Sequence, residues 1–204
     1  MIRNIVFDFG KVIIDFDETL MTAAFVKEES MVETVRSVVF DRLYWDRLDL
    51  GTFTDAEVKA GIAARLPEEW VATAYKVYDH WIDNIHIIEG IEDAILAAKE
   101  KASGGVYLLS NISTQFVEGY PSRPAIKSIL SHFDGLVFSG PLHLVKPDAA
   151  IFRHLLDSYG LCAEETLFID DSPKNIAGAA AVGIRTYLFD GDAAKLRAYI
   201  LSLS

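Results

Sequence analysis

The apolar residues of the chain gather in short continuous runs, and each run stops at a small or polar residue. Strands that are buried on both faces, as in a parallel sheet, have this pattern because neither face meets water. The runs are residues 5–7 before Asp8, 106–109 before Ser110, 136–138 before Ser139, 167–169 before Asp170 and 184–189 before Asp190. The pattern therefore predicts five buried strands.

Helical periodicity separates the later runs. Apolar residues recur at intervals of three and four in residues 91–101 and 149–159, and residues 176–182 form a shorter segment rich in alanine and glycine. Strands that alternate with helices are typical of a doubly wound α/β domain with a mostly parallel, Rossmann-like sheet. We expect this fold class here.

The stretch from residue 17 to residue 88 has another pattern and contains no convincing strand. Apolar residues recur at helical spacing in residues 31–43, residues 54–57 match a capping box, and Pro67 is typical of a first helical turn. We therefore predict an all-helical insertion, or cap. The predicted division is a cap of residues 17–88 and an α/β core of residues 1–16 and 89–204.

Composition narrows the possible partners. The 204 residues are enough for one domain with a modest insertion. A net charge of −11 repels a phosphate backbone, so we expect no nucleic acid partner. No apolar run is long enough to span a membrane and the start lacks a signal-peptide pattern, so we expect a cytoplasmic monomer or homodimer without a membrane partner. The single cysteine, Cys162, excludes an internal disulfide, and we interpret it as a bystander.

Candidate chemistry lies at the ends of the predicted strands. In an open α/β sheet, ligands bind beyond the carboxyl ends of the strands, where Asp8, Ser110 and the Asp170-Asp171 pair are expected, with Lys146 in a nearby loop. A carboxylate can act as a nucleophile toward phosphate, and magnesium prefers hard oxygen ligands. A lysine and a metal neutralise the charge of a transferred phosphoryl group. Each residue taken alone can be explained by a structural role, such as a turn or a helix cap, but the set together favours phosphoryl transfer.

Four segments in a fixed order make the sequence recognisable. They are residues 6–12 (VFDFGKV), residues 108–111 (LLSN), Lys146-Pro147, and residues 168–179 (FIDDSPKNIAGA). With these motifs the chain resembles the haloacid dehalogenase superfamily of phosphohydrolases over essentially its whole length. The helical insertion after the first motif looks like the cap of the first type found in that family.

The resemblance implies a role for each motif residue. Asp8 would be the nucleophile and a magnesium ligand, together with the backbone carbonyl of Gly10 and with Asp170, while Asp171 would support the metal. Ser110 and the backbone N–H of Asn111 would bind phosphate oxygens, and Lys146 would neutralise the aspartate and the phosphoryl group. The implied activity is a magnesium-dependent phosphatase that acts on a small phosphorylated metabolite, such as a sugar phosphate, through an aspartyl-phosphate on Asp8.

The first motif departs from the common family pattern at Gly10. Most phosphatases of the family have a second aspartate there, which protonates the leaving oxygen and then activates water. A subgroup that includes small sugar-phosphate phosphatases has the same Asp-x-Gly-x-Val pattern, so the glycine does not imply inactivity. General acid–base help is worth roughly 10²–10⁴-fold in rate. One hypothesis is that Asp15 or Asp17 replaces it, although we favour the interpretation that both are solvated turn carboxylates.

Aromatic side chains and histidines give weaker signals. The aromatic residues of the predicted cap are typical of packing rather than of a substrate site, and Tyr44 and Trp45 are only guesses for specificity residues. No two of the five histidines have a spacing typical of a metal site, so we expect surface or structural roles for all of them.

Other functions remain open from the sequence. A haloacid dehalogenase would need no metal, which the Asp170-Asp171 pair argues against. A phosphotransferase or mutase would need the base that Gly10 lacks. A catalytically weak or non-catalytic binding or regulatory protein would explain Gly10, but the presence of Asp8, Ser110, Lys146 and Asp170 together opposes it.

Overall fold

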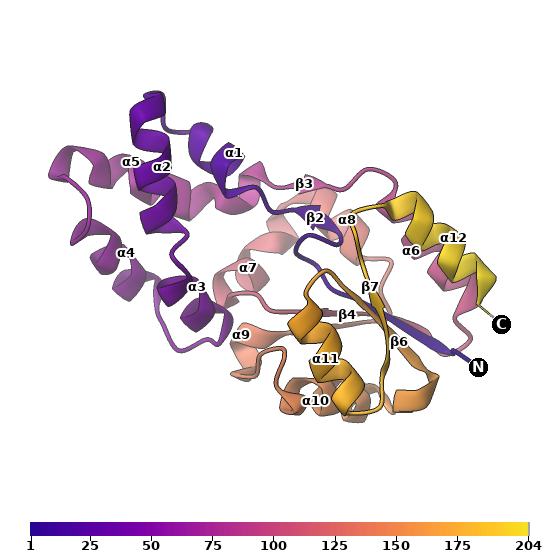
Figure 1. Cartoon of the computed structure of the whole chain (residues 1–204). Coiled ribbons are helices and arrows are strands. Elements are labelled where there is room, and N and C mark those ends of the chain that lie inside the picture. The colour runs from indigo at the N-terminus through magenta and orange to yellow at the C-terminus, as the bar shows by residue number, and fades with distance from the viewer. Residues whose placement is uncertain (204) are drawn as a thin grey trace.

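A five-stranded parallel sheet forms the centre of the computed structural model, which describes residues 1–203. The strand order is β5-β4-β1-β6-β7, and every neighbouring pair is parallel (Figure 1). The strands are β1 (Asn4–Phe7), β4 (Gly105–Ser110), β5 (Gly135–Phe138), β6 (Thr166–Asp170) and β7 (Arg185–Leu188). The predicted doubly wound α/β fold is confirmed, and each strand coincides with one of the apolar runs.

Helices cover both faces of the sheet. Because side chains alternate along a strand, Ile5 and Phe7 of β1 face one helical layer and Val6 faces the other. The first layer consists of α6 (Ile91–Lys101), α8 (Pro124–Leu130) and α12 (Ala193–Ser202), and the second consists of α10 (Ala149–Tyr159) and α11 (Pro173–Ala181). Two short helices, α7 (Thr114–Gly119) and α9 (Ser139–Leu142), follow β4 and β5.

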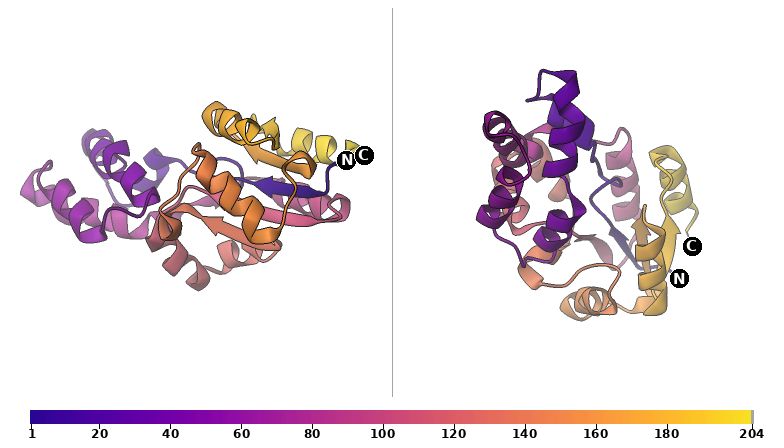
Figure 2. Two further views of the ribbon diagram at one scale, coloured as in Figure 1. Left: turned by 90° about the horizontal axis from the view of Figure 1, so that it is seen from below. Right: turned by 60° about the vertical axis from the view of Figure 1, so that its left-hand side comes forward.

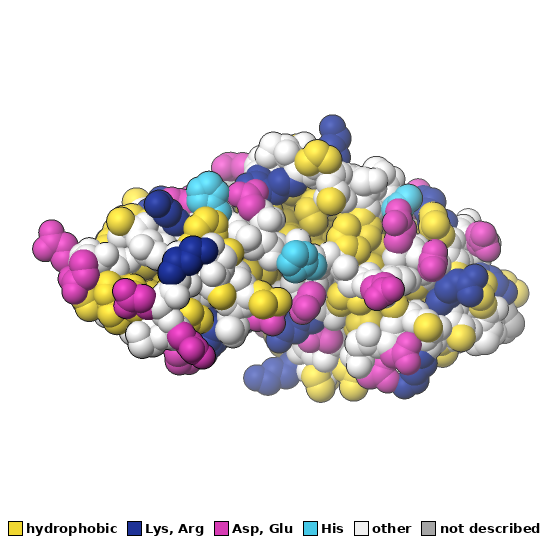
Figure 3. All heavy atoms as spheres, turned by 90° about the horizontal axis from the view of Figure 1, so that it is seen from above, with side chains coloured by type: hydrophobic (Ala, Val, Ile, Leu, Met, Phe, Trp, Pro, Cys, Tyr) yellow, Lys and Arg dark blue, Asp and Glu magenta, His cyan; other side chains and the backbone are white. Residues whose placement is uncertain are grey.

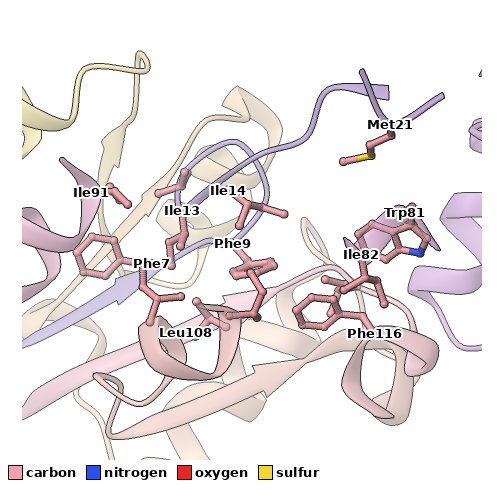
Figure 4. Close-up of a cluster of buried hydrophobic side chains, with 14 of the residues drawn as sticks. Phe7, Phe9, Ile13, Ile14, Met21, Trp81, Ile82, Ile91, Leu108 and Phe116 are labelled. Atoms are coloured by element: carbon pink, nitrogen blue, oxygen red, sulfur yellow. The ribbon is translucent and has the colours of Figure 1, made fainter. Parts of the chain in front are cut away.

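A group of helices lies beyond the carboxyl ends of the strands, at the opposite end of the molecule from the two termini (Figures 1 and 2). They are α1 (Glu18–Ala23), α2 (Glu29–Val39), α3 (Arg42–Asp49), α4 (Asp55–Ala63) and α5 (Glu68–His80), which continues into a 3₁₀ turn, η1 (Trp81–Asn84). The capping box at Thr54 and Glu57 is present and starts α4. Apolar packing continues without a break from β1 toward Trp81 at the end of this group, as Figure 4 shows.

Two details of this region differ from the sequence prediction. A short antiparallel pair links β2 (Ile14–Asp15) to β3 (His86–Ile87), and β3 lies within residues 17–88, which we expected to contain no strand. Two-residue strands leave no periodicity to read. The helical pattern of residues 31–43 is also broken, because the Asp41 side chain accepts a hydrogen bond from the Leu43 N–H and begins a new helix, which leaves Leu43 exposed.

On one face of the molecule the acidic side chains are dispersed. In the face shown in Figure 3, acidic side chains are spread over both ends of the molecule instead of forming one patch. Within residues 1–203, none of the helices combines the length and the apolar character that crossing a membrane requires.

Candidate active site

Asp8, Ser110 and Asp170 come together because their strands are neighbours. β1 lies between β4 and β6 with Phe7 beside Leu108 and Ile169, so the three strands end at the same edge of the sheet. Asp8 directly follows β1, whereas Ser110 and Asp170 are the last residues of β4 and β6. All three side chains are buried, as expected where a sheet edge is covered by other elements.

The Lys146 side chain enters this edge from the loop between α9 and α10 and is almost completely buried. Its Nζ lies 2.6 Å from Asp8 Oδ1 and 2.8 Å from Asp170 Oδ2, and it also donates a hydrogen bond of 3.0 Å to the Leu109 carbonyl oxygen. An ammonium group has three protons to donate, and each has an acceptor here. Lys146 is therefore fixed between the two carboxylates.

Asp170 is held by further donors on its other side. The Ser172 N–H donates to Oδ1 at 2.8 Å, and the Asn175 Nδ2 lies 3.1 Å from Oδ1 and 3.0 Å from Oδ2. Both donors belong to the start of α11, which follows β6 directly. The neighbouring Asp171 completes a group in which Asp8, Asp170 and Asp171 each place a carboxylate oxygen within 4.8 Å of the others.

The charges at this site do not balance without a cation. Burial raises the pKa of Asp8 and Asp171, while the Lys146 ammonium acts in the opposite direction on both carboxyls. Burial lowers the pKa of Lys146, but the attraction of Asp8 and Asp170 outweighs it and raises that pKa, so the ammonium stays charged. Three carboxyl groups thus face one ammonium. Hard oxygen donors with surplus negative charge fit a magnesium ion.

Asn111 has a positioning role that sequence reasoning did not foresee. Its Oδ1 accepts a 2.8 Å hydrogen bond from the Lys146 N–H, and its Nδ2 donates a 2.9 Å hydrogen bond to the Lys146 carbonyl. This two-way pairing ties the backbone of the lysine loop to the end of β4. Ser110 makes one long contact, from its Oγ to the Asn111 carbonyl oxygen at 3.4 Å, so its hydroxyl is weakly committed within the protein.

Two cavities open on this edge from the side of the helical group. A wide one of about 870 Å³ contains Asp8, Lys146 and the start of α11 in its lining. A narrower one of about 210 Å³ lies between the core and the helices α1–α3. Its aromatic wall consists of Phe9, Phe16, Phe40, Trp45 and Trp81, and Glu18 adds a charged group. Gly10, Arg42, Asp49 and Asn111 line both cavities and thus mark their junction.

The structure separates several sequence hypotheses. Neither Asp15 nor Asp17 lines either cavity, and Asp17 caps α1 by accepting hydrogen bonds from the Thr19 and Leu20 N–H groups. Tyr44 also lies outside both cavities. Trp45 lines the narrow one, while its ring packs against Phe16, Phe40 and Trp81 and its Nε1 donates to a backbone carbonyl.

Asp49, at the end of α3, is one of two residues at this junction that sequence reasoning missed, and the other is Arg42. Desolvation by the surrounding atoms raises the pKa of the Asp49 carboxyl group to about 7, and the nearby Asp46 carboxylate adds to this effect. Arg42 and Lys146 act in the opposite direction. Within residues 1–203, this carboxyl group has no hydrogen bond and no ion pair, and because Asp49 is only half-buried its oxygens remain in contact with solvent.

A family model for haloacid dehalogenase-like hydrolases matches residues 2–183. The chain therefore belongs to the haloacid dehalogenase-like hydrolase family. This membership agrees with the parallel sheet, the four motifs and the acidic group at the strand ends.

Named relatives and solved structures extend the similarity over nearly the whole chain. A D-ribitol-5-phosphate phosphatase from Bacteroides thetaiotaomicron is 28% identical over 193 residues, which are 92% of this chain and 91% of the relative. A drimenol cyclase from Aspergillus calidoustus is 25% identical over 191 residues, and the chain spans only 34% of its length.

Among solved structures, a HAD family enzyme from Bacteroides thetaiotaomicron has a TM-score of 0.71 at 25% identity, covering 93% of this chain and 94% of that one. The magnesium complex of that enzyme has a TM-score of 0.67 at 25% identity, covering 92% and 93% of the two chains.

Proposed function

We propose that this protein is a magnesium-dependent phosphatase that hydrolyses a small phosphorylated metabolite through an aspartyl-phosphate on Asp8. The observation that carries the proposal is the geometry at the sheet edge. Asp8 lies 2.6 Å from the Lys146 ammonium and within 4.8 Å of the oxygens of Asp170 and Asp171, and it lines the wide cavity. The phosphatase relative that is similar over most of both chains supports the same activity.

The first step of the proposed reaction belongs to Asp8. Its carboxylate oxygen attacks phosphorus, the bond from phosphorus to the alcohol oxygen breaks, and a mixed anhydride forms on the side chain. Lys146 holds one Asp8 oxygen so that the other can face the substrate. Ser110 and the Asn111 N–H would bind phosphate oxygens, because the Ser110 hydroxyl is weakly committed within the protein.

Asp8, Asp170, Asp171 and the Gly10 carbonyl would hold the magnesium ion. When bound, the metal would neutralise phosphate and carboxylate charge at the point of reaction. The proposal is supported by the charge surplus of the acidic group and by the magnesium complex of the related HAD family enzyme.

The narrow cavity is the place we propose for the alcohol part of the substrate. Its volume of about 210 Å³ admits only a compact group. Aromatic rings can pack against the C–H faces of a sugar or polyol, while Glu18 can accept hydrogen bonds from hydroxyl groups and Arg42 can donate hydrogen bonds to them. In this proposal residues 17–88 act as a cap that reads the leaving group, and a sugar or polyol phosphate is the first substrate class to test.

The proposed function can be tested by phosphate release from an aryl phosphate with and without magnesium. The activated leaving group needs little protonation, so Gly10 should not hide activity. We expect magnesium-dependent turnover that falls by roughly 10⁴-fold or more in Asp8→Asn, because the variant lacks the nucleophile. Asp157→Asn, which removes an exposed carboxylate on α10, is the matched control and should keep full activity. Absence of turnover in the folded wild type would favour a non-catalytic binding or regulatory protein.

A further inference from the structure

Gly10 leaves the proposed reaction without its usual proton donor, and the space around this residue is open. A Cβ atom built on Gly10 would meet no other atom within 4 Å, and the residue has no positive φ that would require glycine. Packing and backbone geometry therefore do not explain the glycine. If the enzyme needs an acid for alkyl leaving groups, another side chain must supply it.

The junction of the two cavities is where such an acid has to be. The phosphoryl group is expected beside Asp8 in the wide cavity and the alcohol part in the narrow one, so the oxygen that joins them lies where the cavities meet. Gly10, Arg42, Asp49 and Asn111 line both cavities. Of these four, Arg42 cannot release its proton at neutral pH and an asparagine does not titrate, which leaves Asp49.

Backbone contacts fix Asp49 in this place and leave its side chain free. The buried Ser139 Oγ donates a 2.6 Å hydrogen bond to the Asp49 carbonyl oxygen, and His143 Nδ1 lies 3.0 Å from the Leu50 carbonyl oxygen. The next residue, Gly51, has a φ of 69° and approaches Gly140 so closely that a Cβ atom would lie 2.1 Å from the Gly140 carbonyl oxygen. The main-chain carbonyl groups at the end of α3 thus hold this end of the helix against side chains of α9 and of the residue that follows it.

We infer that Asp49 is the general acid and base of this enzyme, in the role that position 10 has in most relatives. This inference rests on the proposed phosphatase function. As Asp8 attacks phosphorus, the Asp49 carboxyl group gives its proton to the leaving alkoxide, which departs as the alcohol. The Asp49 carboxylate then takes a proton from the water that attacks the aspartyl-phosphate, the Asp8–phosphate bond breaks, and phosphate leaves. Asp49 ends protonated and Asp8 ends as a carboxylate, so the cycle closes.

The protonation state of Asp49 agrees with this role. A donor must carry a proton near the working pH, and burial of the Asp49 carboxyl group raises its pKa to about 7. Three charged groups influence this pKa: the Asp46 carboxylate acts in the same direction as burial, whereas Arg42 and Lys146 oppose it. The absence of a hydrogen-bond partner within residues 1–203 leaves the carboxyl group available to a substrate oxygen.

The test compares Asp49→Asn with wild type on two substrates in magnesium, an aryl phosphate and an alkyl phosphate such as a polyol phosphate. We expect kcat on the alkyl phosphate to fall roughly 10²–10⁴-fold and kcat on the aryl phosphate to fall less than about tenfold, since only the alkoxide needs a proton. Asp15→Asn and Asp17→Asn are matched controls for loss of one carboxylate. Both should keep their turnover of both substrates, and asparagine at position 17 still caps α1.

A second variant shows whether the acid itself is what was lost. In the Asp49→Asn background, Gly10→Asp places a carboxyl group where the family usually has it. We expect kcat on the alkyl phosphate to be at least tenfold higher in this double variant than in Asp49→Asn alone. Equal losses on both substrates, or full activity of Asp49→Asn on the alkyl phosphate, would overturn the inference. An aryl phosphatase activity that is absent even in wild type would instead overturn the proposed function.

Discussion

The two walls of the active-site cavities hold their polar groups in opposite ways. On the core wall, Lys146 donates to three acceptors and Asp170 accepts from Ser172, Asn175 and Lys146. On the wall formed by α3, the Asp49 carboxyl group has no hydrogen-bond partner within residues 1–203. We call the core wall with the paired Lys146 and Asp170 side chains the saturated wall, and the wall formed by α3 the unsaturated wall. Paired polar groups need little rearrangement during a reaction, whereas an unpaired group gains a partner only when a substrate binds. In the proposed function, the core binds the part that all phosphate esters share, and the helical region binds the part that differs.

Among the three changes that test this comparison of the two walls, the largest effect is expected from removing the central cation of the saturated wall. In Lys146→Met, two buried carboxyl groups face each other without the ammonium, so turnover should fall by roughly 10²–10³-fold. The free energy of unfolding without metal should fall by about 3–5 kcal/mol, because the buried charges lose their partner. Urea unfolding measures this loss, and magnesium should recover part of it by supplying positive charge. Lys127→Met removes an exposed lysine on α8 and serves as the control.

A smaller effect is expected when one proposed magnesium ligand on the same wall, the Asp170 carboxylate, loses a hydrogen-bond donor. Asn175 holds both oxygens of Asp170, and Asn175→Ala frees that carboxylate to rotate. Partners of this kind are worth about 10–100-fold in metal affinity, so the magnesium concentration for half-maximal turnover should rise by that factor. Saturating magnesium should then restore most of kcat. An unchanged magnesium dependence would contradict the placement of Asp170 in the metal site.

The smaller effect on the free energy of unfolding is expected on the unsaturated wall, and it has the opposite sign to that of Lys146→Met. The folded-state pKa of Asp49 is raised to about 7, above roughly 4 in an unfolded chain. Its contribution to stability is therefore present at acidic pH and is lost as the pH rises through 7, when a poorly solvated carboxylate must form. Asparagine carries no such charge, so Asp49→Asn should stabilise the protein by roughly 1–2 kcal/mol at pH 8 after allowance for partial exposure.

Urea unfolding without magnesium at pH 8 and at pH 4.5 checks this sign. The advantage of Asp49→Asn should shrink at the lower pH, where the wild-type side chain is also neutral in the folded state. A variant that is less stable than wild type at pH 8 would show that the Asp49 carboxylate makes favourable contacts instead.

The two walls also differ in how far the sequence predicts them. Asp8, Ser110 and Asp170 could be placed together because buried strands are read from continuous apolar runs, and parallel neighbours end at one edge. Asp49 could not, because it reaches the site through a contact between Ser139 and a main-chain carbonyl, 90 positions apart in sequence. A carbonyl group is the same at every residue, so no sequence signal marks that contact.

The same limit explains the errors in the fold. The pair of β2 and β3 needs two residues from each of two distant segments, too few for any alternation to be recognised. Leu43 matched the helical period of residues 31–39, but the hydrogen bond at Asp41 starts a new helix and changes the direction of every later side chain. Local patterns predict all five strands of the parallel sheet here, and they fail where a single hydrogen bond decides.

The open space at Gly10 has a consequence for the history of this enzyme. A glycine codon that ends in a pyrimidine becomes an aspartate codon by one base change, so a chain with such a codon at position 10 could gain an acid on its core by a single mutation. An acid on the core would work whatever the position of the α3 end, whereas an acid at Asp49 works only while that end rests on α9. If Asp49 is the acid, cleavage of the phosphate ester is therefore coupled to the contact between α3 and α9, whose residues are 90 positions apart in sequence.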